Sequence, residues 1–144
     1  MTSETALSGL LDALEGTGLI AVPTVSSDAA GAVIDRSFFV EEGSANRETG
    51  SGRGAARRSG FRLTESFEIV LQHILNPNEG QRARLAAYRD LAIVQRTLSR
   101  TGTGITTEGA IFLGNVRRSR LQQGAVLEQR ITCEITFNVD LRLE

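Results

Sequence analysis

The feature that most constrains this chain is a strict alternation of apolar and polar side chains over residues 131–143. Period-two alternation is typical of a β-strand with one face on a hydrophobic core and the other face toward water or a partner. The pattern predicts a long closing strand that begins near Ala125. Its apolar positions are Ile131, Cys133, Ile135, Phe137, Val139, Leu141 and Leu143, and its polar positions are Thr132, Glu134, Thr136, Asn138, Asp140 and Arg142.

Two apolar runs earlier in the chain, residues 33–42 and 61–75, predict the paired strands of a β-hairpin. The connecting residues 43–60 have almost no large apolar side chain, and their composition cannot build a core. We therefore expect residues 43–60 to form a long Arg/Gly-rich loop at the tip of the hairpin. Its arginines are Arg47, Arg53, Arg57 and Arg58.

Two segments have the periodicity of amphipathic helices. The first follows Thr2 and ends before Gly16, with an apolar stripe of Leu7, Leu10, Leu11 and Leu14. The second is predicted to start with Asn76 as the cap and Pro77 at the first helical position, and to continue to about Arg100. Its stripe is Ala83, Ala87, Leu91, Val94 and Leu98, supported by Tyr88.

Three weaker patterns complete the expected fold. Residues 19–25 predict a short edge strand, because Pro23 cannot donate a ladder hydrogen bond. Residues 105–116 predict a fourth strand, and residues 117–124 predict a polar turn that contains Arg117, Arg118 and Arg120. The chain is expected to be one α+β domain over residues 1–144. It would have an antiparallel sheet of four to five strands, two main helices packed on one face, and a long hairpin arm.

The composition excludes several kinds of chemistry. All 16 basic residues are arginine, so Schiff-base chemistry and a P-loop lysine are excluded. Cys133 is the only cysteine and His73 the only histidine, which excludes an internal disulfide and a cysteine-rich zinc site. The sequence predicts no enzymatic activity, no bound metal and no cofactor. It also predicts no signal peptide and no membrane-spanning run.

The remaining reactive side chains are expected to have structural roles. His73 shares the strand phase of Ile69 and Leu71, which favours a satisfied position in the core or at its rim. Glu134 and Asp140 lie on one face of the closing strand but roughly 20 Å apart, too far to share a proton or a metal. The acidic side chains of the strands are therefore expected to be solvated or to face a partner.

The Arg/Gly-rich loop allows three interpretations. Five arginines between Arg47 and Arg62 stand against one acid, Glu48. Residues 43–60 have no Walker lysine and contain no aromatic residue that would stack on a base. A flexible solvated tip, a contact with a protein partner and a contact with nucleic-acid backbone all remain open.

The order of these elements resembles that of the tail terminator and tail completion proteins of long-tailed bacteriophages. The segments that carry the resemblance are the strand Phe67-Glu68-Ile69-Val70-Leu71-Gln72-His73, the helix start Asn76-Pro77-Asn78-Glu79 and the closing Ile135-Thr136-Phe137-Asn138-Val139-Asp140-Leu141. The resemblance implies a virion protein, made in the host cytoplasm, that forms a hexameric ring at the head-proximal end of the tail. Such a ring ends polymerisation of the tail tube and provides the head–tail joining surface.

The resemblance implies three partners: copies of the same chain, the tail tube protein, and a neck or connector protein, with possible contact with DNA in the channel. The polar positions Thr132 to Arg142 of the closing strand are the expected subunit interface. Arg47, Arg53, Arg57, Arg58, Arg117, Arg118 and Arg120 are the expected contacts with a partner or DNA. The alternatives are a neck adaptor or tail tube protein of the same particle, or a small nucleic-acid-binding module.

Overall fold

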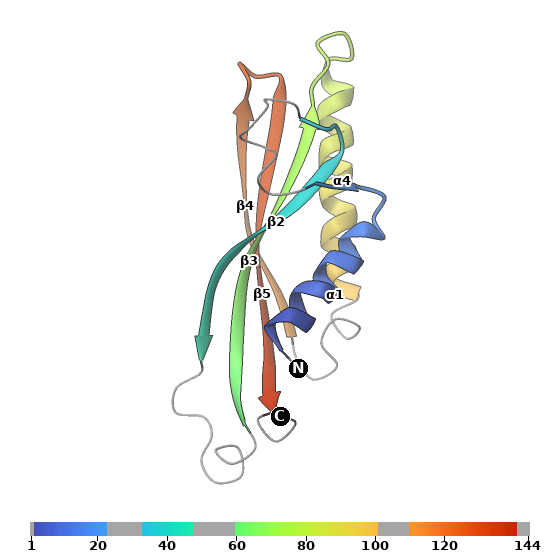
Figure 1. Cartoon of the computed structure of the whole chain (residues 1–144). Coiled ribbons are helices and arrows are strands. Elements are labelled where there is room, and N and C mark those ends of the chain that lie inside the picture. The colour runs from blue at the N-terminus through green and yellow to red at the C-terminus, as the bar shows by residue number, and fades with distance from the viewer. Residues whose placement is uncertain (1, 23–32, 48–59, 101–109, 141–144) are drawn as a thin grey trace.

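The computed structural model describes residues 2–22, 33–47, 60–100 and 110–140. These residues form a five-stranded sheet and two helices (Figure 1). The elements follow in the order α1 (Ser3–Glu15), β1 (Ile20–Ala21), β2 (Ser37–Arg47), β3 (Gly60–Ile74), α4 (Gln81–Arg100), β4 (Ala110–Leu121) and β5 (Val126–Asp140).

The strands are arranged in the order β1-β2-β3-β5-β4. Three of the four pairs are antiparallel, as expected, but β1 runs parallel to β2. The prediction of a wholly antiparallel sheet is therefore wrong at this edge. Residues 22–36 connect the two strands, and a connection of this length permits a parallel crossover that a tight hairpin turn does not.

The closing strand β5 lies between β3 and β4, inside the sheet. Its odd positions Ile131, Cys133, Ile135 and Phe137 are buried, which confirms the predicted phase. They share one hydrophobic cluster with residues of β2, β3, α1 and α4. The cluster explains the alternation, because only one face of this half of β5 meets apolar neighbours. Residues 141–143 of the predicted strand lie outside the described residues.

The first helix begins where the sequence predicts. Thr2 is its N-cap, and the Thr2 side chain accepts a hydrogen bond from the backbone nitrogen of Thr5. The fully buried positions are Ala6, Leu10 and Leu14, so the buried stripe includes Ala6, whereas Leu7 and Leu11 are partly buried.

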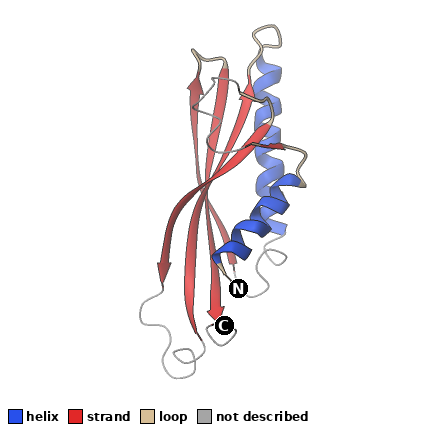
Figure 2. Cartoon of the chain, viewed as in Figure 1, coloured by secondary structure: helices blue, strands red, loops and turns tan. Residues whose placement is uncertain are grey.

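The second helix starts later than predicted. The Asn76 side chain accepts from the backbone nitrogen of Asn78 at 3.0 Å, and the Asn76 carbonyl accepts from the backbone nitrogen of Glu79 at 3.0 Å. These bonds form a turn, and Gly80 follows with a φ of 56° that a helix does not use. The helix α4 therefore begins at Gln81, and its predicted stripe from Ala83 to Leu98 is buried. Both helices lie on the same side of the sheet (Figure 2).

In two segments that were predicted to be loop or turn, the first residues belong to a strand. Residues 43–47 belong to β2, where a bulge between Glu42 and Ala45 shifts the register against β3. A side chain at Gly43 would place its Cβ atom 2.7 Å from the Ser66 carbonyl oxygen, so the bulge needs glycine. The rest of the predicted Arg/Gly-rich loop, including Arg53, Arg57 and Arg58, lies outside the described residues.

The predicted polar turn at residues 117–124 is also mostly strand. Arg117 to Leu121 pair with β5, and the turn consists of Gln122, Gln123 and Gly124, which all have positive φ. A bulge between Leu113 and Val116 changes the phase of β4, so its apolar pattern breaks although the strand continues.

Candidate functional site

The sheet has two different edges. β4 pairs with β5 on one side only, and its other side has no strand neighbour among the described residues. At the opposite edge, β1 pairs with only Ser37 and Phe38 of β2, so β2 continues to Arg47 without a described neighbour on its outer side. Unpaired backbone N–H and C=O groups at such edges can bind a strand from another chain.

The two edges carry opposite charge. β4 contains Arg117, Arg118 and Arg120 and no acid. The middle of β2 contains Glu41 and Glu42, and Arg47 at its end stacks on the Phe61 ring with its guanidinium carbon 4.3 Å from the ring centroid. An acidic β2 edge and a basic β4 edge therefore lie on opposite sides of one molecule.

The β4 edge also exposes a large apolar side chain. Phe112 is 64% exposed and lies opposite Glu134 in the register with β5. The sequence predicts a strand over residues 105–116, which include Phe112, but it does not show that this strand lies at an edge. Phe112 therefore gives the β4 edge one exposed apolar ring.

A network of charges crosses the face of the sheet opposite the helices. The Arg130 guanidinium lies 2.7 Å from a Glu68 oxygen, 2.7 Å from a Glu128 oxygen and 3.2 Å from a Glu41 oxygen. Arg117 adds a contact with Glu68 at 3.1 Å. The charged network therefore joins β2, β3, β5 and β4.

The pKa values follow from this arrangement. The hydrogen bond with Arg130 holds the pKa of Glu68 below its usual value. Burial alone would lower the pKa of Arg130, but its hydrogen bonds with Glu68, Glu128 and Glu41 outweigh burial and raise it. These groups are charged and paired with each other within one chain.

The polar face of β5 is less open than the sequence suggests. Thr132, Glu134 and Thr136 are partly buried, and the Thr136 hydroxyl lies 2.9 Å from that of Thr64. Asn138 is exposed. Because β5 lies between two strands, these positions can contact a neighbouring subunit only through their side chains. Asp140 ends the strand, and Arg142 lies outside the described residues.

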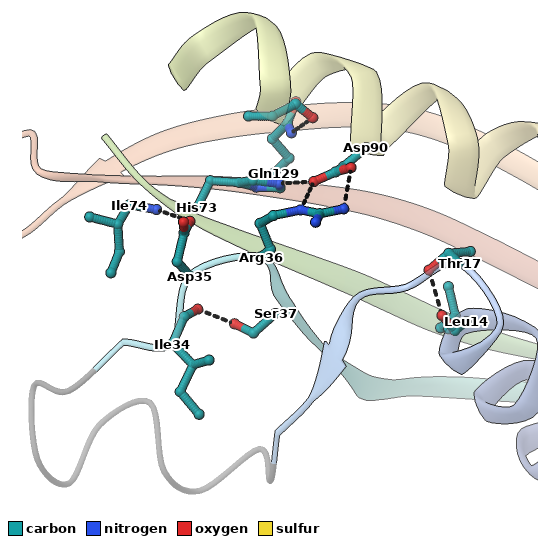
Figure 3. Close-up of polar contacts among 11 residues, drawn as sticks. Leu14, Thr17, Ile34, Asp35, Arg36, Ser37, His73, Ile74, Asp90 and Gln129 are labelled. Atoms are coloured by element: carbon teal, nitrogen blue, oxygen red, sulfur yellow. Dashed lines mark hydrogen bonds and ion pairs between the residues drawn. The ribbon is translucent and has the colours of Figure 1, made fainter. Parts of the chain in front are cut away.

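Three polar side chains, Arg36, His73 and Asp90, meet between α4 and the sheet, and we call them the Asp90 cluster (Figure 3). Arg36 donates two hydrogen bonds to the Asp90 carboxylate, at 2.9 and 3.1 Å, and His73 Nε2 lies 2.8 Å from Asp90 Oδ2. Burial raises the pKa of Asp90, but the hydrogen bonds from Arg36 and His73 outweigh burial and lower it overall. The cluster fixes the start of β2 and the end of β3 to α4.

The Asp90 cluster contains the residues of a histidine–aspartate pair without a described nucleophile. The Nδ1 atom of His73 is buried and has no hydrogen-bond partner in the described part of the chain. Burial, with a contribution from Glu134, raises the pKa of the Cys133 thiol to about 12, so Cys133 behaves as a small hydrophobic group. His73 is buried, as its strand phase predicts, but its Nδ1 atom is not satisfied within the described residues.

Asp90 was missed by the sequence analysis although a signal was present. Position 90 lies three residues after Ala87 and four before Val94, on the buried side of α4. An acid at that position predicts a buried partner. Tyr88 was expected to support the stripe, but it is 38% exposed, and its ring lies under the Arg118 guanidinium instead.

The described arginines that were predicted to contact a partner or DNA lie at different edges of the sheet. Arg47 lies at the β2 edge and Arg117, Arg118 and Arg120 at the β4 edge. Arg117 faces the charged network, whereas Arg118 lies on the helix-covered side, where it donates to the Gln129 side chain at 3.0 Å. Arg120 donates to the Gly124 carbonyl at 3.4 Å.

Two kinds of feature are absent from residues 2–22, 33–47, 60–100 and 110–140. These residues contain no group of three or more His, Cys, Asp or Glu side chains that could hold a metal ion. None of the helices they form is both long and apolar enough to cross a membrane.

Comparison with models of known protein families gives no match, and comparison with curated proteins gives none either.

Proposed function

We propose that this chain is a structural subunit that assembles edge to edge into a closed ring. The observation that carries the proposal is the pair of unlike sheet edges, one acidic and one basic, on opposite sides of the same sheet. When one surface meets a different surface on the next subunit, the interface is heterologous, and a suitable rotation closes the assembly into a ring.

The chemistry of the edges supports this mode of assembly. The basic β4 edge of one subunit would meet the acidic β2 edge of the next, and backbone hydrogen bonds would extend the sheet across the interface. Phe112 would lose its exposed surface in the same contact. Two identical edges would instead bring like charges together, which disfavours a twofold dimer through either edge.

We further infer that the ring belongs to the tail of a bacteriophage and is a tail terminator at the head-proximal end. This inference rests on the resemblance in element order given above. In that role the ring stops addition of tail tube subunits and offers its other face to a neck or connector protein. A neck adaptor or tail tube protein of the same particle is the alternative within this class.

Charged substitutions at one position of each edge test the ring. Asn115 is exposed on β4 and Glu42 is exposed on β2. We expect Asn115→Glu and Glu42→Arg each to weaken assembly by about tenfold or more, because each puts like charges at the interface. The double variant restores opposite charges and should recover assembly. Asn115→Arg keeps the sign of the β4 edge and is the matched control.

Mass photometry measures the outcome across a concentration series. A chain that stays monomeric at every concentration, alone and with tail tubes, contradicts the ring. Equal assembly by all four variants contradicts the edge contact while leaving other ring interfaces to be mapped.

Electron microscopy of tail tubes separates the members of the class. A terminator binds one end of preassembled tubes and stops their growth when added during polymerisation. A tube protein would instead enter the tube along its length, and a neck adaptor would leave tube growth unchanged.

A further inference from the structure

A hollow lined by arginine lies between the start of α4 and the turn that joins β4 to β5. It has two adjoining parts of about 340 and 170 Å³, and Arg84 and Arg120 line both of them. Arg118 and Tyr88 line the smaller part. No Asp or Glu side chain is found among the described residues that line either part. We call this feature the arginine-lined hollow.

Arg118 is held in place by a chain of contacts. Gln129 is fully buried and donates from its Nε2 atom to the Ala87 carbonyl of α4 at 3.0 Å. Its other side-chain atom, Oε1, accepts from Arg118 Nε at 3.0 Å. The Arg118 guanidinium carbon lies 4.4 Å from the Tyr88 ring centroid. These contacts use the Nε atom and one flat face, and they leave the two terminal amino groups for a ligand.

The other two arginines come from different elements. Arg84 belongs to the beginning of α4 and donates to the Gln81 side chain at 3.2 Å. Arg120 belongs to β4 and donates to the Gly124 carbonyl at 3.4 Å. The first turn of α4 contains no acid, so the positive end of the helix dipole is not neutralised there. Three guanidinium groups thus lie around one space without a described counter-charge in its lining.

We propose that the arginine-lined hollow binds a phosphate group, supplied either by a free phosphate compound or by a nucleic-acid backbone. Guanidinium groups donate paired hydrogen bonds that match phosphate oxygens. Three guanidinium donors from two elements, α4 and β4, suit a tetrahedral group with several acceptor oxygens better than a planar carboxylate with two. The larger part of the hollow has room for the group to which the phosphate is attached.

The position of Tyr88 also predicts how a nucleic acid would be recognised. The Arg118 guanidinium covers one face of the Tyr88 ring, so that face cannot stack on a base. The guanidinium groups of the hollow would bind the backbone phosphates, which carry no sequence information directly. The hollow lies on the helix-covered side of the sheet and shares Arg118 and Arg120 with the basic β4 edge of the proposed ring.

The chain contains its own optical probe for the test. Tyr88 is the only tyrosine and there is no tryptophan, so tyrosine emission reports on the ring that lies against Arg118. Titration with inorganic pyrophosphate should change this emission in the wild type. Fluorescence anisotropy with labelled duplex DNA of two unrelated sequences measures the second source of phosphate.

The variants are Arg118→Gln and Arg84→Gln, with Arg117→Gln as the control. Arg117 is the neighbour of Arg118 on the same strand, but its side chain lies on the opposite face and contacts Glu68. Arg118→Gln and Arg117→Gln therefore remove the same charge from neighbouring positions of β4, but on opposite faces of the sheet. We expect Arg118→Gln and Arg84→Gln each to weaken phosphate binding about tenfold, and Arg117→Gln to leave it unchanged. For DNA, the slope of log affinity against log salt should fall by about one for each hollow variant.

Each outcome has a defined meaning. Pyrophosphate binding without DNA binding identifies a free phosphate compound, and DNA binding that pyrophosphate displaces identifies the backbone. Equal weakening by Arg118→Gln and Arg117→Gln overturns the proposal, because it indicates diffuse charge attraction. Absence of binding to both probes at low salt also overturns it, as does binding of a glutamate-rich peptide alone. Arg84→Gln, at a partly buried helix position, keeps the test valid if Arg118→Gln does not fold.

Discussion

The two halves of β5 are buried in different ways. From Ile131 to Phe137 the strand buries every second residue in an apolar cluster. From Val126 to Gln129 all four residues are buried, and two of them are polar. The polar pair is satisfied on both faces of the sheet, Glu128 by Arg130 and Gln129 by the Ala87 carbonyl. One half is held by apolar contact, whereas the other is held by hydrogen bonds and ion pairs with distant residues.

This difference explains which parts of the fold can be predicted from the sequence. The apolar alternation, the stripe of α4 and the cap of α1 can be predicted because each depends on residues that lie close together in the sequence. Three partners of Glu128, Gln129 and Asp90 lie 40 or more residues away and leave no local pattern: Gln72, Ala87 and Arg36. The second half of β4 was missed for the same reason, because its arginines pack on Glu68, Gln129 and Tyr88. Only parts of the edge strands β2 and β4 were predicted as strand, and neither could be predicted to lie at an edge, since strand order depends on tertiary pairing.

The largest expected effect comes from a charge in the apolar half. Phe137 is 1% exposed within the core. Phe137→Asp loses a buried ring and gains an unpaired buried charge, which together cost more than about 5 kcal/mol and exceed the stability of many domains. We expect no cooperative unfolding transition in circular dichroism. Asn138→Asp at the exposed neighbouring position should change the free energy of unfolding by less than about 0.5 kcal/mol, and a folded Phe137→Asp protein would contradict the assignment of the core.

A smaller effect is expected where the polar half meets α4. Asp90→Ala leaves buried His73 without its partner and frees Arg36, which is half exposed and can return to water. We expect a loss of about 3 kcal/mol in urea unfolding. Arg89→Ala, at the preceding exposed position of α4, should change stability by less than about 0.5 kcal/mol. Equal effects of the two substitutions would show that the Asp90 cluster does not hold the helix.

A decrease in pH should distinguish the wild type from Asp90→Ala. The folded pKa of Asp90 is lowered below its usual value, so the unfolded chain takes up a proton at higher pH than the folded chain does. The stabilisation is therefore present above about pH 4 and is lost as pH falls through the folded pKa. Between pH 6 and pH 3 the wild type should lose more stability than Asp90→Ala. A parallel loss in both proteins would contradict a charged Asp90 in the folded state.

The smallest effect concerns the charged network. Arg130→Met leaves Glu68 and Glu128 without their main partner, and we expect a loss of about 2 kcal/mol. Arg117→Met removes a contact whose arginine side chain is 70% exposed, so its effect should be below about 1 kcal/mol. Thermal or urea unfolding of both variants gives the ranking. The reverse order would place the centre of the network at β4 and not at β5.

Both edge strands contain a β-bulge, whereas the central pair of β3 and β5 keeps one register from Gly60 to Ile74. A bulge bends its strand and interrupts pairing, so a straight partner strand can follow β4 only before or only after the bulge. The same holds for β2. In the proposed ring, each contact between subunits would then be short and weak by itself, and the ring would gain stability by closing all of its contacts at once. Such edges favour assemblies that end at a fixed size over sheets that grow without limit.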